Sequence, residues 1–199
     1  MRTCNFRLKN LARIGSKLDT DLKKTLVQNY ILTRLDYCNS IFTSLNSKNL
    51  NKLQSVLNSA AHFVFNDYNR NWNKRSSSAV TEKLLFDLHF LPVQFRVIFK
   101  ICLLCYKCIN QQAPSYLSEL INLREQSAYY NLRIDTDVTF LNIPTKPHLK
   151  KSEFAFEHYA PSIWNEIPAH IRATSSIKDF KTRLKTFLFD KAYPHFSSL

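Results

Sequence analysis

The stretch LHFLPVQFRVIFKICLLCYKCIN, residues 88–110, decides the fold class. Pro92 disfavours helical geometry at the residue before it, so one helix must end there and another can begin beyond it. After Pro92, apolar side chains recur at the three- and four-residue spacing of a helix. A rotation of about 100° per residue places Arg96, Lys100 and Lys107 within roughly 40° of one another. We therefore predict a helix that is apolar on nearly every side and carries one thin basic stripe.

The same stretch holds three cysteines, Cys102, Cys105 and Cys108, whose regular spacing raises the question of a metal site. On a helix that rises about 1.5 Å per residue, Cys102 and Cys108 lie roughly 9 Å apart along the axis and about 120° apart around it. A zinc ion about 2.3 Å from each sulfur cannot reach both. The spacing therefore predicts small buried thiols in a core, and we expect no metal.

The amino-acid composition also favours a helical fold. The chain has 199 residues and a single glycine, Gly15, where an average soluble chain of this length would have roughly 14. Phosphate-binding loops and nucleophile elbows need glycines, so P-loop, dinucleotide-fold and GxSxG chemistries are unlikely, and tight β-hairpins are disfavoured. We expect a mainly α protein, a helical bundle with a short irregular or extended segment around residues 124–150.

The charge is strongly positive. There are 28 Lys and Arg against 15 Asp and Glu, a formal net charge of +13 with a pI near 9.6. Such a balance favours a polyanionic partner, although many lysines also keep a helical protein soluble. No signal peptide is visible, and the longest apolar run is too short to span a bilayer. We expect an intracellular protein, nuclear or cytoplasmic, with no membrane partner and with free thiols.

Helical periodicity also outlines the N-terminal part. In residues 21–45 a three- and four-residue spacing places apolar side chains on one side of a helix and leaves Lys23, Lys24 and Asn29 among the more exposed positions. Residues 50–65, preceded by Ser47 as a candidate N-cap, repeat the pattern. The predicted apolar faces consist of Leu22, Leu26, Tyr30, Thr33, Tyr37 and Ile41 in the first helix and Leu50, Leu53, Leu57, Ala60, Ala61 and Val64 in the second.

The expected organisation is a helical bundle over residues 1–66, a polar linker over 67–78 and a C-terminal helical region over 79–199. In the linker, Tyr68, Trp72 and Arg75 could stack on unpaired bases. In the last helix, residues 176–193, the same rotation places Lys178, Lys181 and Lys185 on one strip, and Phe180, Leu184, Phe187 and Leu188 form the buried arc. Basic strips of this kind can follow a phosphate backbone, and they are also typical of a solvated helix face.

Catalytic residues are not evident. Two-metal phosphoryl transfer needs closely placed carboxylates, and the close aspartate pairs are Asp19 with Asp21, at a helix start, and Asp135 with Asp137, in an expected loop. Glu166 and His170 are four residues apart, but Pro168 separates them. We expect no catalytic residue and no cofactor.

Four blocks of the sequence, in this order and at this spacing, resemble a known family. They are RLDYCNSIF (34–42), LHFLPVQFRVIFKICLLCYKCINQQAPSYL (88–117), FAFEHYAPSIWNEIP (154–168) and IKDFKTRLKTFLF (177–189). They resemble the C-terminal part, the thumb and the region after it, of non-LTR (LINE-type) retrotransposon reverse transcriptases of the jockey and chicken-repeat branch. The aromatic-x-Asp-Asp motif that holds the catalytic metals in that family does not occur here.

The resemblance implies a helical thumb that grips RNA or a template–primer duplex, with Lys23, Lys24, Arg96, Lys100 and Lys107 as backbone contacts. Such a chain would bind nucleic acid without being an enzyme by itself. The alternative is a degenerate or domesticated fragment that acts only as a protein-interaction module. It would associate with the missing polymerase palm, or with itself, through an apolar face left uncovered.

Overall fold

The structure is a computed structural model that describes residues 1–65, 77–123, 140–144 and 152–196. Within these ranges the chain is helical and forms no strand, with one isolated antiparallel bridge between Leu123 and Leu141. The expected mainly α fold is confirmed. Most of the irregular segment expected around 124–150 lies outside the described residues.

The chain forms two compact units, Met1–Val97 with Leu188–Leu199, and Ile98–Phe187. We call them unit 1 and unit 2. Two long helices, α6 (Val93–Ile109) and α10 (Ile177–Ala192), contribute residues to both units. The boundaries therefore fall inside helices and do not coincide with the polar linker expected at residues 67–78, most of which lies outside the described part of the chain.

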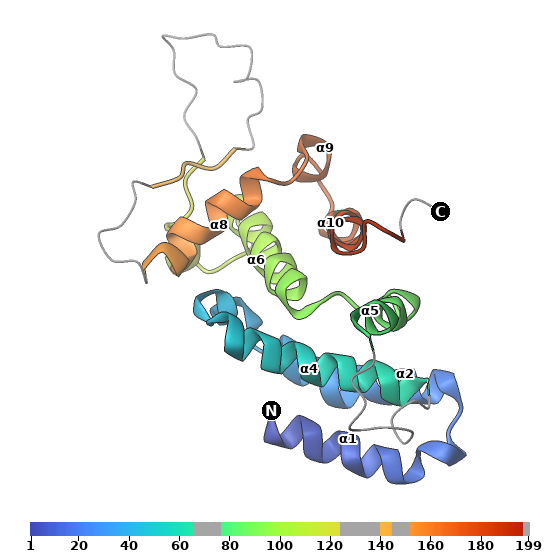
Figure 1. Cartoon of the computed structure of the whole chain (residues 1–199). Helices are drawn as coiled ribbons and strands as arrows, with labels where there is room; N and C mark the ends of the chain where they lie inside the picture. Colours follow the sequence, from blue (N-terminus) through green and yellow to red (C-terminus); the bar gives the residue numbers. More distant parts are fainter. Residues whose placement is uncertain (66–76, 124–139, 145–151, 197–199) are drawn as a thin grey trace, which may run out of the picture. The chain divides into compact units, whose positions relative to one another are not determined.

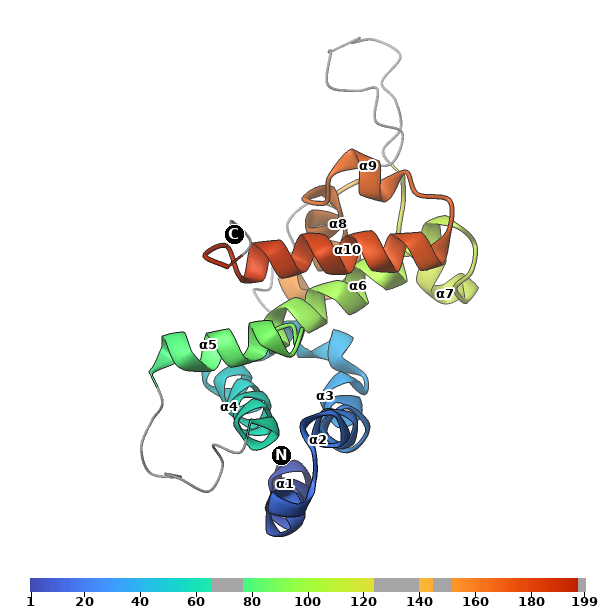
Figure 2. The ribbon, with the colours of Figure 1, turned by 90° about the vertical axis from the view of Figure 1, so that its right-hand side faces the viewer.

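Unit 1 is built on its first helices. Helix α1 packs against α4 and against the π turn that follows α2. Helices α2 and α4 run side by side, and α5 crosses α4 (Figures 1 and 2). Its core includes Leu8 of α1, Val27 of α2 and Leu57 of α4, all with no exposed surface. The elements are α1 Arg2–Ile14, α2 Thr20–Val27, a π turn Gln28–Leu32, α3 Thr33–Asp36, α4 Ser47–Val64 and α5 Ser78–Asp87, with short 3-10 turns at Gly15–Lys17 and Asn39–Ser44.

The apolar face predicted for residues 21–45 is wrong. Its larger members are exposed, by 46% at Leu22, 49% at Tyr30, 76% at Tyr37 and 67% at Ile41. Four buried side chains instead recur every four residues, at Lys23, Val27, Ile31 and Leu35, and Leu32 and Asn39 are buried as well.

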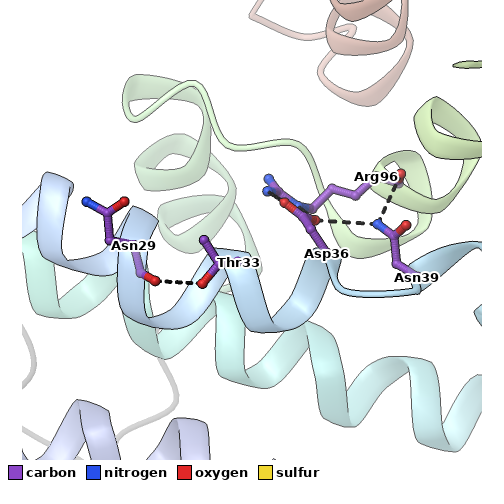
Figure 3. Close-up of polar contacts among 5 residues, drawn as sticks. All are labelled: Asn29, Thr33, Asp36, Asn39 and Arg96. Carbon is purple, nitrogen blue, oxygen red and sulfur yellow. Dashed lines mark hydrogen bonds and ion pairs between the residues drawn. The ribbon is translucent and has the colours of Figure 1, made fainter.

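The π turn explains the buried series. In a regular α-helix a four-residue step turns about 40° beyond a full circle, so a series of such steps drifts off one face. The wider π turn takes up an extra residue and keeps Ile31 and Leu35 in line with Val27. Next to it, the Thr33 hydroxyl donates to the Asn29 carbonyl at 2.6 Å (Figure 3). The Asn29 amide donates to the Thr25 carbonyl at 3.0 Å.

The N-cap of α4 lies one residue before the predicted one. Asn46 caps α4, its side chain accepting from the Asn49 N–H at 2.9 Å, although the sequence indicated Ser47. Ser77 caps α5 through the Val80 N–H at 3.4 Å. The apolar face predicted for α4 is confirmed, because its last four members are buried and its first two pack against the same core.

Several helix ends use a left-handed residue other than glycine. Cys38, His89 and Gln111 have φ of 51°, 57° and 55°. After α5 the Phe90 N–H donates to the Leu85 carbonyl at 2.9 Å, a six-to-one bond that closes the helix end. Glycine is the usual residue at such positions, so this chain holds its helix ends by packing and hydrogen bonds.

Gly15 serves a different purpose. Its φ is −57°, which any residue adopts. A Cβ at this position would lie 3.1 Å from a ring carbon of Phe63, which is 2% exposed. The glycine therefore provides room for a buried ring.

The C-terminal end of α10 completes unit 1. The Tyr193 hydroxyl donates to the Phe90 carbonyl at 2.6 Å, and Phe86 packs against Phe189 and Phe196 with ring centroids 5.2 and 5.1 Å apart. These contacts join the two ends of the unit across about a hundred residues of sequence.

Unit 2 packs around the second half of α6. Tyr106 stacks on Phe180 of α10 at 4.3 Å and donates to the Thr174 carbonyl at 3.0 Å. Trp164, buried on α8, lies 5.7 Å from the same ring. The Asn165 side-chain amide accepts a hydrogen bond from the Leu141 N–H and donates one to the Leu141 carbonyl, both at 2.9 Å. The remaining helical elements of this unit are α7 Ser115–Ser118, a 3-10 turn Ser152–Phe154, α8 Phe156–Asn165 and α9 Ala169–Arg172.

The first prediction concerns Tyr193→Phe. Losing the hydroxyl leaves the Phe90 carbonyl without its donor, so we expect the free energy of unfolding to fall by about 1–2 kcal/mol near neutral pH, measured by urea denaturation. Burial, then the nearby Glu82 carboxylate, raises the pKa of Tyr193 above its ordinary value, with Arg96 opposing.

The sign of the pH dependence follows from that shift. A phenol with a raised folded-state pKa stabilises the fold fully below the unfolded value of about 10 and loses this contribution as the pH rises further. The advantage of the wild-type protein over Tyr193→Phe should therefore shrink above that pH. An advantage that stays constant with pH would contradict the assignment.

Candidate nucleic-acid interface

Helix α10 carries the predicted lysine strip on its surface. Lys178, Lys181 and Lys185 are exposed, and Phe180 and Leu184 on the other side have no exposed surface. A rotation of about 100° per residue places the three lysines on an arc of about 60°. The acidic residues of the helix, Asp179 and Asp190, lie outside that arc. The strip is thus a continuous band of positive charge within the described part of α10.

The stripe predicted on α6 is different, because Arg96 is engaged inside unit 1. Its Nε donates to Oδ1 of Asp36 at 2.7 Å and a terminal nitrogen contacts Oδ2, a two-pronged ion pair (Figure 3). The Arg96 side chain is only 16% exposed. The Asn39 amide nitrogen lies 3.4 Å from Oδ1 of Asp36 and 3.4 Å from the Arg96 carbonyl. A guanidinium neutralised in this way adds little to a phosphate-binding surface.

The other predicted contacts divide into three groups. Lys23 is 1% exposed and makes contacts within the protein, so its expected exposure is wrong. It occupies the buried four-residue series of α2 described above. Lys24, Lys100 and Lys107 are half-buried. Tyr68, Trp72 and Arg75, the predicted stacking residues, lie outside the described residues.

The cysteines of α6 are core residues, as predicted. Cys102 and Cys105 have no exposed surface and Cys108 is 5% exposed. The Cys105 thiol lies 3.8 Å from the Ala160 carbonyl. Burial, followed by the two neighbouring cysteines, raises the pKa of Cys105 well above its ordinary value, so the thiol is neutral and a poor nucleophile.

The acidic residues considered for catalysis are not arranged as a catalytic group where the structure describes them. Asp19 caps α2, its side chain accepting from the Leu22 N–H at 2.8 Å. Glu166 follows α8 and His170 lies in α9, separated by Pro168 as the sequence indicated. Asp135 and Asp137 lie outside the described residues. Among the residues that are described, no group of three His, Cys, Asp or Glu side chains is arranged to hold a metal ion.

A basic face that the sequence reasoning missed lies on α1. Arg2, Lys9 and Arg13 are exposed, and so is Phe6, by 64%. The angular test applied above to α6 and α10 would have found this group, since the four residues share an arc of about 60° on a regular helix.

Comparison with protein-family models, with curated proteins and with solved structures finds no match to this chain. No helix of the described part of the chain is both long and apolar enough to cross a membrane.

The second prediction tests whether Arg96 supports the fold. Arg96→Gln leaves the Asp36 carboxylate without its cation, and because Asp36 is 41% exposed we expect a loss of only about 1–2 kcal/mol in the free energy of unfolding. Asp36→Asn should cost a similar amount, and the double variant should cost less than the sum.

Arg34→Gln is the matched control, because Arg34 is an exposed arginine of the same segment. It should change stability by less than about 0.5 kcal/mol. Additive costs for Arg96→Gln and Asp36→Asn in urea denaturation would refute the coupling.

Proposed function

We propose that the chain binds the phosphate backbone of RNA or of an RNA–DNA template–primer. In this proposal it is the thumb and post-thumb fragment of a non-LTR retrotransposon reverse transcriptase, acting inside the cell in the nucleus or the cytoplasm. The observation that carries the binding proposal is the exposed lysine strip of α10. The four sequence blocks that resemble the family support the choice of ligand.

The strip suits backbone contact rather than base reading. Lysine ammonium groups are point charges that bind phosphates without recognising a base edge. Each phosphate that a lysine neutralises releases condensed counterions, so affinity falls as salt rises. The formal charge of +13 adds a long-range attraction that speeds encounter with a polyanion.

Polymerisation is not part of the proposal. The sequence has no aromatic-x-Asp-Asp motif, and two-metal catalysis of nucleotidyl transfer requires closely placed carboxylates. We propose that the fragment grips nucleic acid and leaves chemistry to a palm on another chain or on a longer protein.

A second candidate function is a protein-interaction module. It is favoured by the exposed apolar side chains of the segment after α1, of which Tyr37 and Ile41 are 76% and 67% exposed. Where exposed large apolar side chains form one contiguous patch, they mark a surface that binds another protein. A polymerase palm or a second copy of the chain would be such a partner.

The third prediction concerns the lysine strip. Replacing Lys178, Lys181 and Lys185 with Gln should weaken binding to RNA. It should also make the slope of log affinity against log salt shallower by about 2 for a single strand, at about 0.7 per contact. The measurement is a fluorescence-anisotropy titration at several salt concentrations.

Arg183 provides the matched control, because it is exposed on the same helix but lies about 160° around the axis from Lys185. Arg183→Gln should leave the slope nearly unchanged, and Lys185→Gln should not. Absence of binding at low salt, or binding that ignores salt, would refute the proposed function and favour the interaction module.

The fourth prediction is that the chain alone does not extend a primer. A labelled primer annealed to an RNA template should keep its length when incubated with the protein, nucleotides and either Mg²⁺ or Mn²⁺, because the sequence lacks the aromatic-x-Asp-Asp motif that would hold the metals. An active reverse transcriptase in the same mixture serves as the positive control. Any metal-dependent lengthening by the purified chain would contradict the proposal.

A further inference from the structure

The exposed face of α1 has an unusual composition. Cys4 and Leu8 are buried at 5% and 0% exposure, and a rotation of about 100° per residue puts Arg2, Phe6, Lys9 and Arg13 opposite them. The face extends for about 16 Å along the axis, at about 1.5 Å per residue. It therefore presents three cations and one aromatic ring together, on a single straight element.

The charge of this face is not balanced nearby. Residues 1–18 contain no Asp or Glu, and the first acidic residue is Asp19, in the cap of α2. Within the residues that the structure describes, no carboxylate pairs with Arg2, Lys9 or Arg13. The face therefore keeps its positive charge for an external anion, in contrast to Arg96, whose charge Asp36 neutralises.

Phe6 distinguishes this face from the strip on α10. It is 64% exposed, and a large aromatic side chain among cations offers a flat surface for stacking. Every nucleobase has a π-face that can stack on such a ring, provided that the base is not already stacked within a duplex. The combination of cations and one exposed ring fits a single strand better than a duplex.

The face is held in a fixed position. Arg7 donates through a terminal nitrogen to the Tyr30 carbonyl at 3.1 Å, and its guanidinium lies 5.6 Å from the centre of the Tyr30 ring. These contacts tie α1 to the π turn, while Cys4 and Leu8 anchor it in the core. A surface that does not rearrange loses less entropy on binding.

The packing of α1 also bears on whether its basic face binds nucleic acid or an anionic membrane. A helix that lies on a membrane inserts its apolar face between the lipids. The apolar side chains Cys4, Leu8 and Leu11 of α1 pack into the core of unit 1. Ile14, at the last position of the helix, is 48% exposed, but it does not form a continuous apolar face that could insert into lipid. This favours nucleic acid over an anionic bilayer.

We propose that Arg2, Phe6, Lys9 and Arg13 form a second binding surface, one that takes a single strand of nucleic acid through phosphate contacts and one stacked base. The inference rests on the proposed function, because the ligand belongs to the same class. It differs in the residues that bind and in its preference for unpaired bases.

The test uses the full chain and two probes, a labelled single-stranded RNA without secondary structure and a blunt duplex of the same sequence. Lys9→Gln with Arg13→Gln should make the salt slope for the single strand shallower by about 1.4, at about 0.7 per contact. Phe6→Ala should weaken single-strand binding about tenfold and leave the duplex unchanged. Circular dichroism confirms that each variant is folded.

Two matched controls separate a specific face from general charge. Lys48→Gln with Lys52→Gln removes two exposed lysines from α4, and Tyr116→Ala removes an aromatic residue that is 67% exposed. Neither should change single-strand affinity by more than about twofold if the α1 face is the site, since distant surface substitutions have small effects.

The possible outcomes are distinguishable. Loss of single-strand affinity in the α1 variants, with no such loss in the two controls, supports the inference. Binding that depends on the α10 lysines but not on α1 overturns it and leaves the proposed function standing. Absence of all RNA binding overturns both. If Lys9→Gln with Arg13→Gln weakens binding to anionic lipid vesicles but not to RNA, the α1 face binds lipid headgroups and not nucleic acid, and the inference fails.

Discussion

Helix α6 carries apolar side chains around nearly its whole circumference, and such a helix is stable only when other elements cover it. Val93 lies in the core of unit 1, and Cys105 and Tyr106 are buried in unit 2. Burying one large apolar side chain contributes about 1.5–3 kcal/mol, so both cores depend on this one element. The Arg96 guanidinium near its start is tolerated because Asp36 neutralises it.

Charge composition overstates the positive surface. Lys23 is buried, Arg96 is paired, and Arg172 is 6% exposed, with its Nε donating to the Ile167 carbonyl at 2.9 Å and its guanidinium 4.0 Å from the centre of the Phe140 ring. These cations stabilise the two units from within. Among the described residues, α1 and α10 each present a group of exposed cations on one side of a regular helix.

Periodicity predicted the fold class and the positions of α4, α6 and α10, because long helices repeat one pattern over several turns. It misplaced the buried face of residues 21–45, since a π turn changes the rotation per residue and nothing in the local sequence marks where that occurs. It also could not identify Asp36 as the partner of Arg96, because the two are separated by 60 residues and meet only in the folded chain. The spacing of residues was enough to predict which side of α10 is exposed. It was not enough to predict which cations, such as Arg96, are paired with a carboxylate inside the protein.

The single glycine couples two distant positions. Because Gly15 makes room for the Phe63 ring and has an ordinary helical φ, the constraint is one of volume and not of backbone conformation. An added methyl group at position 15 is compatible with the fold only if the side chain at position 63 becomes smaller or shifts. The two positions thus behave as one steric unit, in which a change of size at either end sets what the other can hold.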